Sequence, residues 1–414
     1  MARKVSAPAS LGKLCSYNEN MKKNPLGTYN IARFLRDCWQ KKPLVLRGIA
    51  PGLADALRRD DLIDLACRDD AESRLIIGSG RRWEVRHGPF RKRDFAGLPA
   101  RRWTLLVNGV DTLVPAARQL QNDFGFIPYA RQDDVMVSYA APGGGVGPHF
   151  DSYDVFLLQG AGTRRWQISN QRDLSLLEDA PLKILSRFRA QQDWRMQSGD
   201  LLYLPPHHAH HGVAIGECLT WSIGMRAPTQ REVASEFLDY LQDRLQDSEV
   251  YRDPGLKPQA HRAEIGPQMQ KALRRMVERI RWGDTDIDRC IGQMLSEPRQ
   301  NVVFSPEPAI NTRVFSDELV ERGLQLDLKT RLLFDRKLFF INGEAVSIAA
   351  SDTKLFRQLA DERALAAGQG ISHKARVLLQ CWHEAGYVHF GDAPKTVVAR
   401  RSPQQRSTAR RKPG

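Results

Sequence analysis

Short apolar runs separated by glycine and proline dominate the first 227 residues of the chain. Each run has four or five residues, which is the length of a buried strand rather than of a helix. Many short strands with turn residues between them are typical of a β-sandwich or a barrel. The segment Gly160–Gly162 lies between two such runs and predicts a hairpin turn. The runs that support the prediction are 43–46, 103–107, 135–139, 155–158 and 201–204.

The pattern changes to a helical period at Thr229. Thr229 and Glu232 have the spacing of a capping box, and apolar residues then recur every four positions as far as Leu245. Two further helical patterns cover 269–280 and 287–295. Because these amphipathic helices have little core of their own, they need a surface to pack against. A spacer within one chain and a bundle that joins two chains both remain open.

A small module of helices and strands is predicted after residue 300. An apolar run before Asn342-Gly343 predicts a two-residue hairpin. One helix is expected over 355–366, and another from Ser372 or His373 to Glu384. Two helices followed by a hairpin indicate a winged helix, a module that binds nucleic acid in some proteins and serves as a protein scaffold in others.

The charge of the chain, +14, lies partly at its end, since residues 400–414 contain six basic residues and no acidic one. We expect a disordered basic tail that either makes weak contact with rRNA or the ribosome or remains merely solvated. The chain has no apolar run long enough to span a membrane and no secretory signal pattern at its start. Its six scattered cysteines indicate free thiols, so we expect a cytoplasmic protein without a membrane partner.

The first candidate metal ligands are His149 and Asp151, which follow a glycine-rich run. Residues two apart on a strand point to the same face, so an imidazole and a carboxylate can bind one ion. Four histidines at 207, 208, 210 and 211 follow a buried run and two prolines, and offer a third ligand from a return strand. Two histidines and one carboxylate form the facial triad of non-haem Fe(II) oxygenases. A polar loop or an adventitious metal site is the alternative.

A cationic side chain is expected beside this group. Arg164 and Arg165 follow the Gly160–Gly162 turn, so one of them can point into the same barrel. A buried guanidinium needs an anion, and a dicarboxylic cosubstrate supplies one through a bidentate pair. The alternative is an arginine exposed on a strand.

The run 142–160, which contains His149 and Asp151, resembles the bacterial JmjC (cupin-type) ribosomal oxygenases, the ribosomal protein arginine 3-hydroxylase family. Segment 199–206 and the order of the predicted modules extend the resemblance over nearly the whole chain except the tail. The resemblance implies a mixed α and β chain built on a double-stranded β-helix, or jelly-roll. Its implied parts are an oxygenase domain over 1–227, a helical dimerisation region over 228–300, a winged-helix domain over 301–398 and the tail over 399–414.

The same resemblance implies an Fe(II)- and 2-oxoglutarate-dependent dioxygenase that uses O2 to hydroxylate a ribosomal protein. The implied target is the β-carbon of an arginine in the sixteenth large-subunit ribosomal protein, and the implied assembly is a homodimer. The family's pattern of two prolines, three residues, a histidine, one residue and a glycine implies His210 as the third iron ligand, with His149 and Asp151. The implied contacts are Arg164, Ser138 and Thr220 for 2-oxoglutarate, and Asp134, Met136, Tyr153 and Ser222 for substrate.

Two features of the residues bear on these implied contacts. Asp134, Met136 and Ser138 alternate along one predicted strand and therefore share a face, where a carboxylate can pair with a substrate guanidinium. Thr220 stands where relatives often carry asparagine. Two other functions remain open: a non-catalytic cupin and winged-helix regulator that binds nucleic acid, and the same chemistry on another basic protein or RNA.

Overall fold

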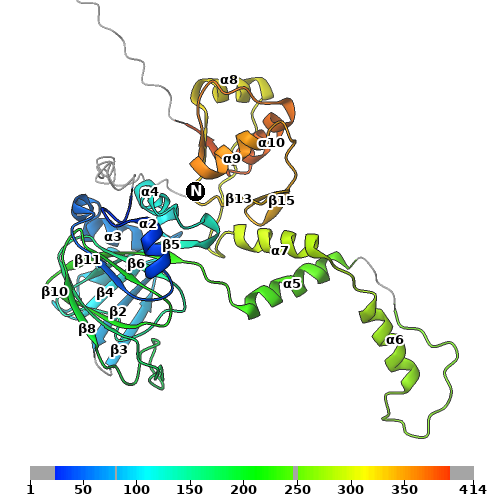
Figure 1. Cartoon of the computed structure of the whole chain (residues 1–414), viewed down its shortest axis with the longest axis horizontal. Coiled ribbons are helices and arrows are strands. Elements are labelled where there is room, and N and C mark those ends of the chain that lie inside the picture. Colours follow the sequence, from blue (N-terminus) through cyan, green and yellow to red (C-terminus); the bar gives the residue numbers. More distant parts are fainter. Residues whose placement is uncertain (1–23, 80–81, 246–249, 392–414) are drawn as a thin grey trace, which may run out of the picture. The chain divides into compact units, whose positions relative to one another are not determined.

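The computed structural model of the chain describes residues 24–79, 82–245 and 250–391. These residues fall into two compact units (Figure 1). The first contains the described residues up to Phe304 together with Leu328–Ser347, and the second contains Ser305–Asp327 with the described residues from Ile348 onward. Within the described ranges, no helix is both long and apolar enough to cross a bilayer. The predicted tail over 399–414 lies outside the described residues.

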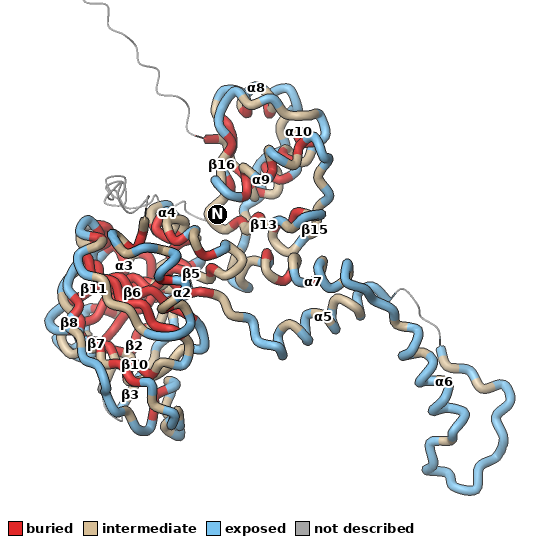
Figure 2. Tube along the Cα trace, in the orientation of Figure 1, coloured by how far each residue is buried: buried red, intermediate tan, exposed pale blue. Residues whose placement is uncertain are grey.

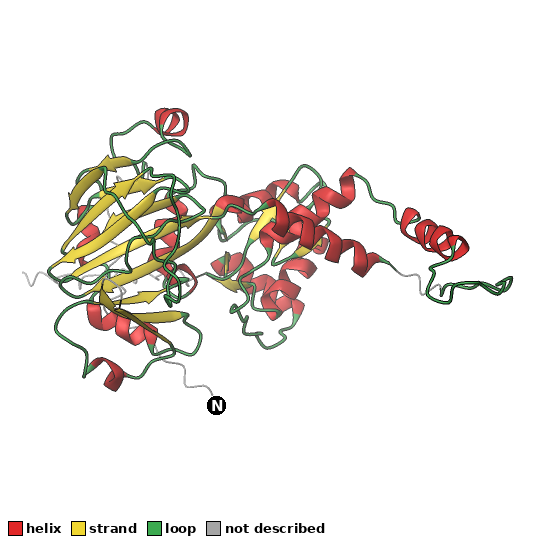
Figure 3. Ribbon diagram, turned by 90° about the horizontal axis from the view of Figure 1, so that it is seen from below, coloured by secondary structure: helices red, strands yellow, loops and turns green. Residues whose placement is uncertain are grey.

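Two antiparallel sheets form the centre of the first unit. The larger has the order β1-β9-β6-β11-β5-β4-β2-β3, and the smaller has the order β10-β7-β8. Figure 3 shows the strands of both sheets. The strands of the larger sheet are β1 (Leu44–Leu46), β9 (Leu201–Leu204), β6 (Val155–Gln159), β11 (Cys218–Met225), β5 (Gln132–Ala140), β4 (Trp103–Val107), β2 (Ser73–Ser79) and β3 (Arg82–His87). Those of the smaller are β10 (Ala209–Ile215), β7 (Thr163–Ser169) and β8 (Gln192–Met196).

The inner faces of the two sheets close on each other. Alternate residues of a strand point to opposite faces, so each strand presents one set of side chains inward. Val155 and Leu157 of β6 share a buried cluster with Trp166 and Ile168 of β7. This packing of one sheet on the other is the double-stranded β-helix, and it confirms the predicted fold class.

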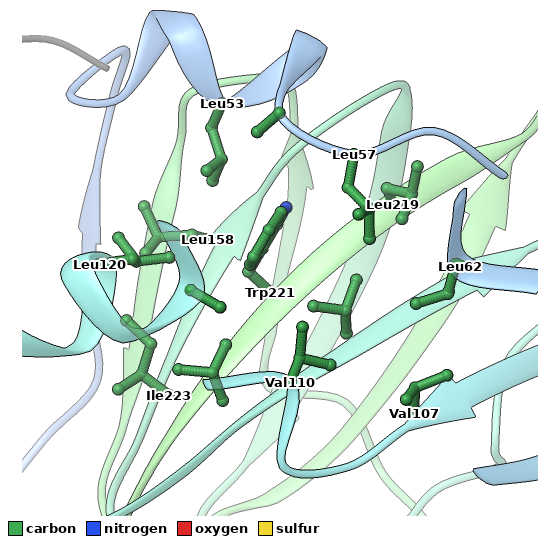
Figure 4. Close-up of a cluster of buried hydrophobic side chains, with 14 of the residues drawn as sticks. Leu53, Leu57, Leu62, Val107, Val110, Leu120, Leu158, Leu219, Trp221 and Ile223 are labelled. Atoms are coloured by element: carbon green, nitrogen blue, oxygen red, sulfur yellow. The ribbon is translucent and has the colours of Figure 1, made fainter. Parts of the chain in front are cut away.

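Helices cover the outer face of the larger sheet and form the main core with it. Trp221 of β11 is buried there among apolar side chains from the covering segments (Figure 4). Leu53, Leu62 and Leu120 come from three of these segments. Because the outer face is filled by this core, polar chemistry is left to the inner face. The covering elements are α2 (Ile31–Asp37), η2 (Pro51–Asp55), α3 (Arg59–Ala66), η3 (Lys92–Phe95), η4 (Val110–Thr112), α4 (Pro115–Asp123) and η5 (Tyr129–Arg131).

The predicted hairpin at Gly160–Gly162 is wrong. β6 ends at Gln159 in the larger sheet, and β7 begins at Thr163 in the smaller sheet, where it pairs with β10 and β8. The glycines therefore carry the chain from one sheet to the other. Short runs joined by glycine do not reveal which strands pair, because pairing is decided by partners far along the chain.

The predicted helical region consists of α5 (Gln230–Arg244), α6 (Pro267–Glu278) and α7 (Asp284–Ser296). The expected capping box is present, since the Thr229 hydroxyl accepts from the N–H of Glu232 and the Glu232 carboxylate accepts from the N–H of Thr229. α5 packs against α7, and the Tyr240 hydroxyl donates to Asp286 across this contact. Figure 2 shows that α6 has no buried stretch.

A small sheet of β13 (Leu332–Phe334), β14 (Phe339–Ile341) and β15 (Glu344–Val346) belongs to the first unit, although its sequence lies within the expected winged-helix segment. α7 packs on β14, and the Arg331 guanidinium donates to the carbonyl oxygens of Tyr129, Gln132 and Leu295. Burial lowers the pKa of Arg331 to about 10. The hairpin between β14 and β15 turns at Asn342-Gly343 as predicted, with both residues at positive φ.

The second unit contains the remaining helices and a three-stranded sheet with the order β16-β12-β17. Phe315 and Leu319 of α8 and Leu379 of α10 contribute to its buried interior. The two helices that the sequence predicted there are present as α9 and α10, but α9 ends at Glu362 rather than Ala366, because Ala364–Leu365 forms β16. The elements are α8 (Thr312–Arg322), β12 (Leu324–Leu326), α9 (Thr353–Glu362), β16 (Ala364–Leu365), α10 (His373–Glu384) and β17 (Val388–Phe390).

Candidate metal centre and substrate pocket

Three side chains with metal-binding atoms meet at the inner face of the barrel. His149 forms an isolated antiparallel bridge with His210 of β10, in which each backbone N–H donates to the other's carbonyl. Asp151 follows two residues after His149, and its Oδ2 lies 3.6 Å from Nε2 of His210. One ligand atom from each of the three lies within 4.8 Å of the other two. Among the described residues, this is the one group of at least three such side chains.

The orientation of both imidazoles suits metal binding. Nδ1 of His149 lies 3.0 Å from the carbonyl oxygen of Gly147, and Nδ1 of His210 lies 2.9 Å from that of His208. Because a carbonyl oxygen only accepts, each Nδ1 carries the proton and each Nε2 is left as the metal ligand. Burial, and then the neighbouring His149, lower the pKa of His210 to about 4, so this ring is neutral at pH 7.

The glycine-rich run before His149 allows the close approach of two backbones. A Cβ placed on Gly145 would lie 2.4 Å from the carbonyl oxygen of Gly212 in β10. Any larger residue would therefore separate the run from the strand that carries His210. This contact gives a physical reason for glycine at this point of the run.

Arg164 places a positive charge on the same inner face. Its side chain is 6% exposed, and its guanidinium carbon lies 5.6 Å from the centre of the Trp166 ring. Nη1 donates to the Ser138 hydroxyl at 3.4 Å, whereas Nε and Nη2 have no hydrogen-bond partner within the described parts of the chain. Arg165 points to the opposite face, where it is exposed and pairs with Asp193.

The two other residues predicted to contact the cosubstrate, Ser138 and Thr220, lie on neighbouring strands of the larger sheet. Thr220 of β11 is directly opposite Ser138 of β5. The Thr220 hydroxyl donates to Oε1 of Gln159 at 3.1 Å, and Gln159 lies on β6 at the other side of β11. A buried guanidinium with two free donor atoms beside hydroxyl groups fits one carboxylate of a small dicarboxylic acid.

The predicted substrate residues lie along β5 and β11, with one after the metal-binding segment. Met136 is directly opposite Ser222, and Asp134 lies one step further along the same face of β5. A Cβ on Gly224 would be 3.4 Å from Oδ1 of Asp134 and 3.7 Å from the Tyr153 ring. The two side chains therefore lie on the same side of β11. Tyr153 is 39% exposed, so its ring is accessible to a substrate.

A charged neighbour of Asp134 was missed by the reasoning from sequence. Nη1 of Arg299 lies 3.2 Å from Oδ2 of Asp134, and Nη2 lies 3.1 Å from Oδ1 of Asp133. Burial raises the pKa of Asp134 to about 6, and the positive charge of Arg299 limits this rise. Nothing in the local sequence indicates the pair, because Arg299 follows α7 and Asp134 is in β5.

Comparison with known proteins gives the same order of domains. The JmjC domain matches residues 119–233, and the ROXA-like winged helix matches residues 279–389. The ribosomal protein uL16 3-hydroxylase of Escherichia coli is 36% identical over 309 residues, which cover 74% of this chain and 81% of that protein. A probable ribosomal oxygenase of Haemophilus influenzae is 42% identical over 228 residues, or 54% of each chain.

Solved structures agree with this relationship over more of the chain. The X-ray structure of E. coli YcfD has a TM-score of 0.77 at 32% identity and covers 88% of this chain and 98% of its own. The ribosomal oxygenase YcfD in complex with cobalt and 2-oxoglutarate has a TM-score of 0.74 with the same coverage. The inner-face group of two histidines and an aspartate thus lies in a matching fold. This chain belongs to the JmjC-domain ribosomal oxygenase family.

Proposed function

We propose that the chain is an iron(II)- and 2-oxoglutarate-dependent hydroxylase whose substrate is the β-carbon of an arginine in ribosomal protein uL16. One observation carries the proposal: His149, Asp151 and His210 converge on the same barrel face as Arg164, whose Nε and Nη2 have no hydrogen-bond partner among the described residues. A metal-binding group alone is compatible with many reactions. A buried guanidinium beside it requires an anion, which an anionic cosubstrate would supply.

We assign the iron ligands to Nε2 of the two histidines and the carboxylate of Asp151, which fit a two-histidine, one-carboxylate triad. With 2-oxoglutarate and O2, iron(II) in such a site supplies the oxidising power that hydroxylates an aliphatic carbon. Arg164, Ser138 and Thr220 are assigned to hold 2-oxoglutarate. The side chains then have to place one carbon of the substrate and exclude water.

Recognition of an arginine is assigned to the mouth of the barrel. The Asp134 carboxylate suits a guanidinium, and Met136 and Tyr153 suit the alkyl stem that carries it. Ser222, opposite Met136, adds a hydroxyl to the same face. The choice of uL16 as the target protein follows the name of the E. coli relative, a ribosomal protein uL16 3-hydroxylase.

The helical region is assigned to dimer formation. Several apolar residues of α6 and its flanks are exposed, including Val277 and Trp282. A cavity of about 630 Å³ between α5 and α6 is lined by Phe237, Leu241 and Ile280. Covering such a face with a second copy buries apolar area that water otherwise contacts.

We also propose a cytoplasmic location, where ribosomal proteins are made. The proposed domain limits are 1–227 for the oxygenase domain, 228–300 for the helical region and 301–398 for the winged-helix domain.

The test compares the wild type with His149→Ala, Asp151→Ala and His207→Asn on recombinant uL16. His207 is exposed at positive φ, which asparagine tolerates, and it serves as the matched histidine control. Succinate formation and addition of one oxygen atom to an arginine should be lost in the two triad variants and kept in the control. Turnover by either triad variant at the wild-type rate would contradict the ligand assignment.

A further inference from the structure

Arg299 bridges two adjacent carboxylates at the mouth of the barrel. It lies in the segment after α7, outside the JmjC match, and its guanidinium contacts Asp133 and Asp134 through different nitrogens. The Asp134 side chain is 18% exposed, and that of Arg299 is 33% exposed. Such a two-armed contact holds both carboxylates in one arrangement, because the planar guanidinium presents its donors in a fixed fork.

The two carboxylate oxygens of Asp134 have different surroundings. Oδ2 accepts from the N–H of Gly109 at 3.0 Å and lies against Nη1 of Arg299. Oδ1 lies on the Gly224 side, 3.4 Å from where a Cβ on Gly224 would stand, and the Tyr153 ring lies 3.7 Å from the same point, on the side assigned to the substrate. One oxygen is thus anchored by the protein, and the other is directed at the pocket.

The charges around Asp134 explain why an anchoring cation is needed there. A carboxylate that is buried beside other acidic groups favours its protonated form, and a protonated carboxyl no longer attracts a cation. Arg299 opposes this tendency, while Asp111 is itself paired with Arg118 at 2.7 Å. The charged or titratable groups that face Asp134 are Arg299, Asp133, Asp111 and Tyr153.

We propose that Arg299 is a positioning residue for substrate recognition, which keeps Asp134 ionised and aimed so that its free oxygen binds the guanidinium of the target arginine. This inference rests on the proposed function. A segment from the helical region thereby completes a pocket in the barrel. The opposite role, in which Arg299 occupies the place of the substrate and competes with it, predicts the reverse change in affinity.

The experiment measures binding and turnover of a uL16 peptide that contains the target arginine. The variants are Arg299→Gln, Arg299→Lys and the control Arg68→Gln. Arg68 pairs with Asp70 at 2.7 Å and is 30% exposed, so the control removes a similar pair far along the chain from the pocket residues. Each protein is assayed for peptide Kd, KM and kcat between about pH 5 and about pH 8.5, a range that includes the raised pKa of Asp134, about 6.

In Arg299→Gln, the peptide Kd and KM should rise about 10- to 100-fold at neutral pH, which corresponds to the loss of one charge-assisted hydrogen bond. The kcat at saturating peptide should change little. Loss of the cation raises the pKa of Asp134 further, so the defect should shrink as pH rises. Arg299→Lys should restore part of the affinity, and Arg68→Gln should match the wild type.

Several results would overturn the inference. An unchanged Kd and KM in Arg299→Gln would leave Arg299 with a structural role, and a lower Kd would show that it competes with substrate. If the loss of peptide affinity in Arg299→Gln does not change with pH, the role of Arg299 does not depend on the charge of Asp134. If the wild type binds the peptide without hydroxylating it, the proposed function fails while the Kd comparison still decides the role of Arg299. If the wild type does neither, both fail.

Discussion

Replacing Arg164 by methionine tests whether the buried guanidinium holds a dicarboxylic cosubstrate. Methionine keeps an unbranched stem of similar length but removes the charge and all donors. Hydrogen bonds to charged groups contribute about 1.5–3 kcal/mol each, so a contact through Nε and Nη2 contributes about 3–6 kcal/mol. At about 1.4 kcal/mol per factor of ten, the affinity for 2-oxoglutarate should fall at least about a hundredfold.

Arg164→Met should lower the affinity for 2-oxoglutarate, but it should not lower the stability of the protein without cosubstrate. Arg164 is 6% exposed, and two of its nitrogens have no partner within the described residues. Burying a charge without partners is unfavourable, so Arg164→Met should not lower the free energy of unfolding and is expected to raise it. A merely structural arginine would give the reverse result.

Thermal unfolding with and without 2-oxoglutarate, in the presence of iron(II) and without oxygen, measures both effects. A ligand that binds the folded state raises the Tm, and this rise should disappear in Arg164→Met. Arg165→Met is the matched control, because Arg165 is exposed and pairs with Asp193 on the other face of β7. Its surface pair contributes about 0–1 kcal/mol, so it should keep the rise. Wild-type affinity for 2-oxoglutarate in Arg164→Met would refute the assignment.

Three further predictions concern the pocket, the barrel and the helices. In the wild type, the KM for uL16 should rise as pH falls through about 6, because protonation removes the charge of Asp134, whose pKa is raised to about 6. In initial-rate assays, the KM of Asp134→Asn should not depend on pH in this way. Gly212→Ala should lower the unfolding free energy by about 1–3 kcal/mol in denaturant titrations, since its Cβ would lie 2.6 Å from the Trp166 ring, whereas Gly52→Ala meets nothing within 4 Å. Trp282→Ser should weaken the proposed dimer in analytical ultracentrifugation, and a wild-type mass at every concentration would contradict the role given to this helical region.

Local patterns in the sequence were sufficient to predict many elements. The capping box at Thr229 and the hairpin at Asn342-Gly343 form as expected, because both depend on residues within a few positions of each other. The convergence of His149 and Asp151 was also predictable, since two residues separated by one position point to one face. These features need only the geometry of the backbone.

Features made by distant segments were not predictable in the same way. The Gly160–Gly162 segment joins two sheets rather than two paired strands, since the partners of β7 are β8 and β10. The pair of Arg299 and Asp134 depends on where the chain runs after α7. Ion pairs of this kind follow from tertiary packing, and neither side chain has a local pattern that marks its partner.

The most direct test of the proposed function is mass spectrometry of uL16 from a strain that lacks this chain, compared with its parent. We predict that uL16 of the parent carries one additional oxygen atom on an arginine and that the deletion strain lacks it. The wild-type gene should restore this oxygen atom, and Asp151→Ala should not. Identical uL16 masses in the parent and the deletion strain would contradict the assignment of uL16 as the substrate.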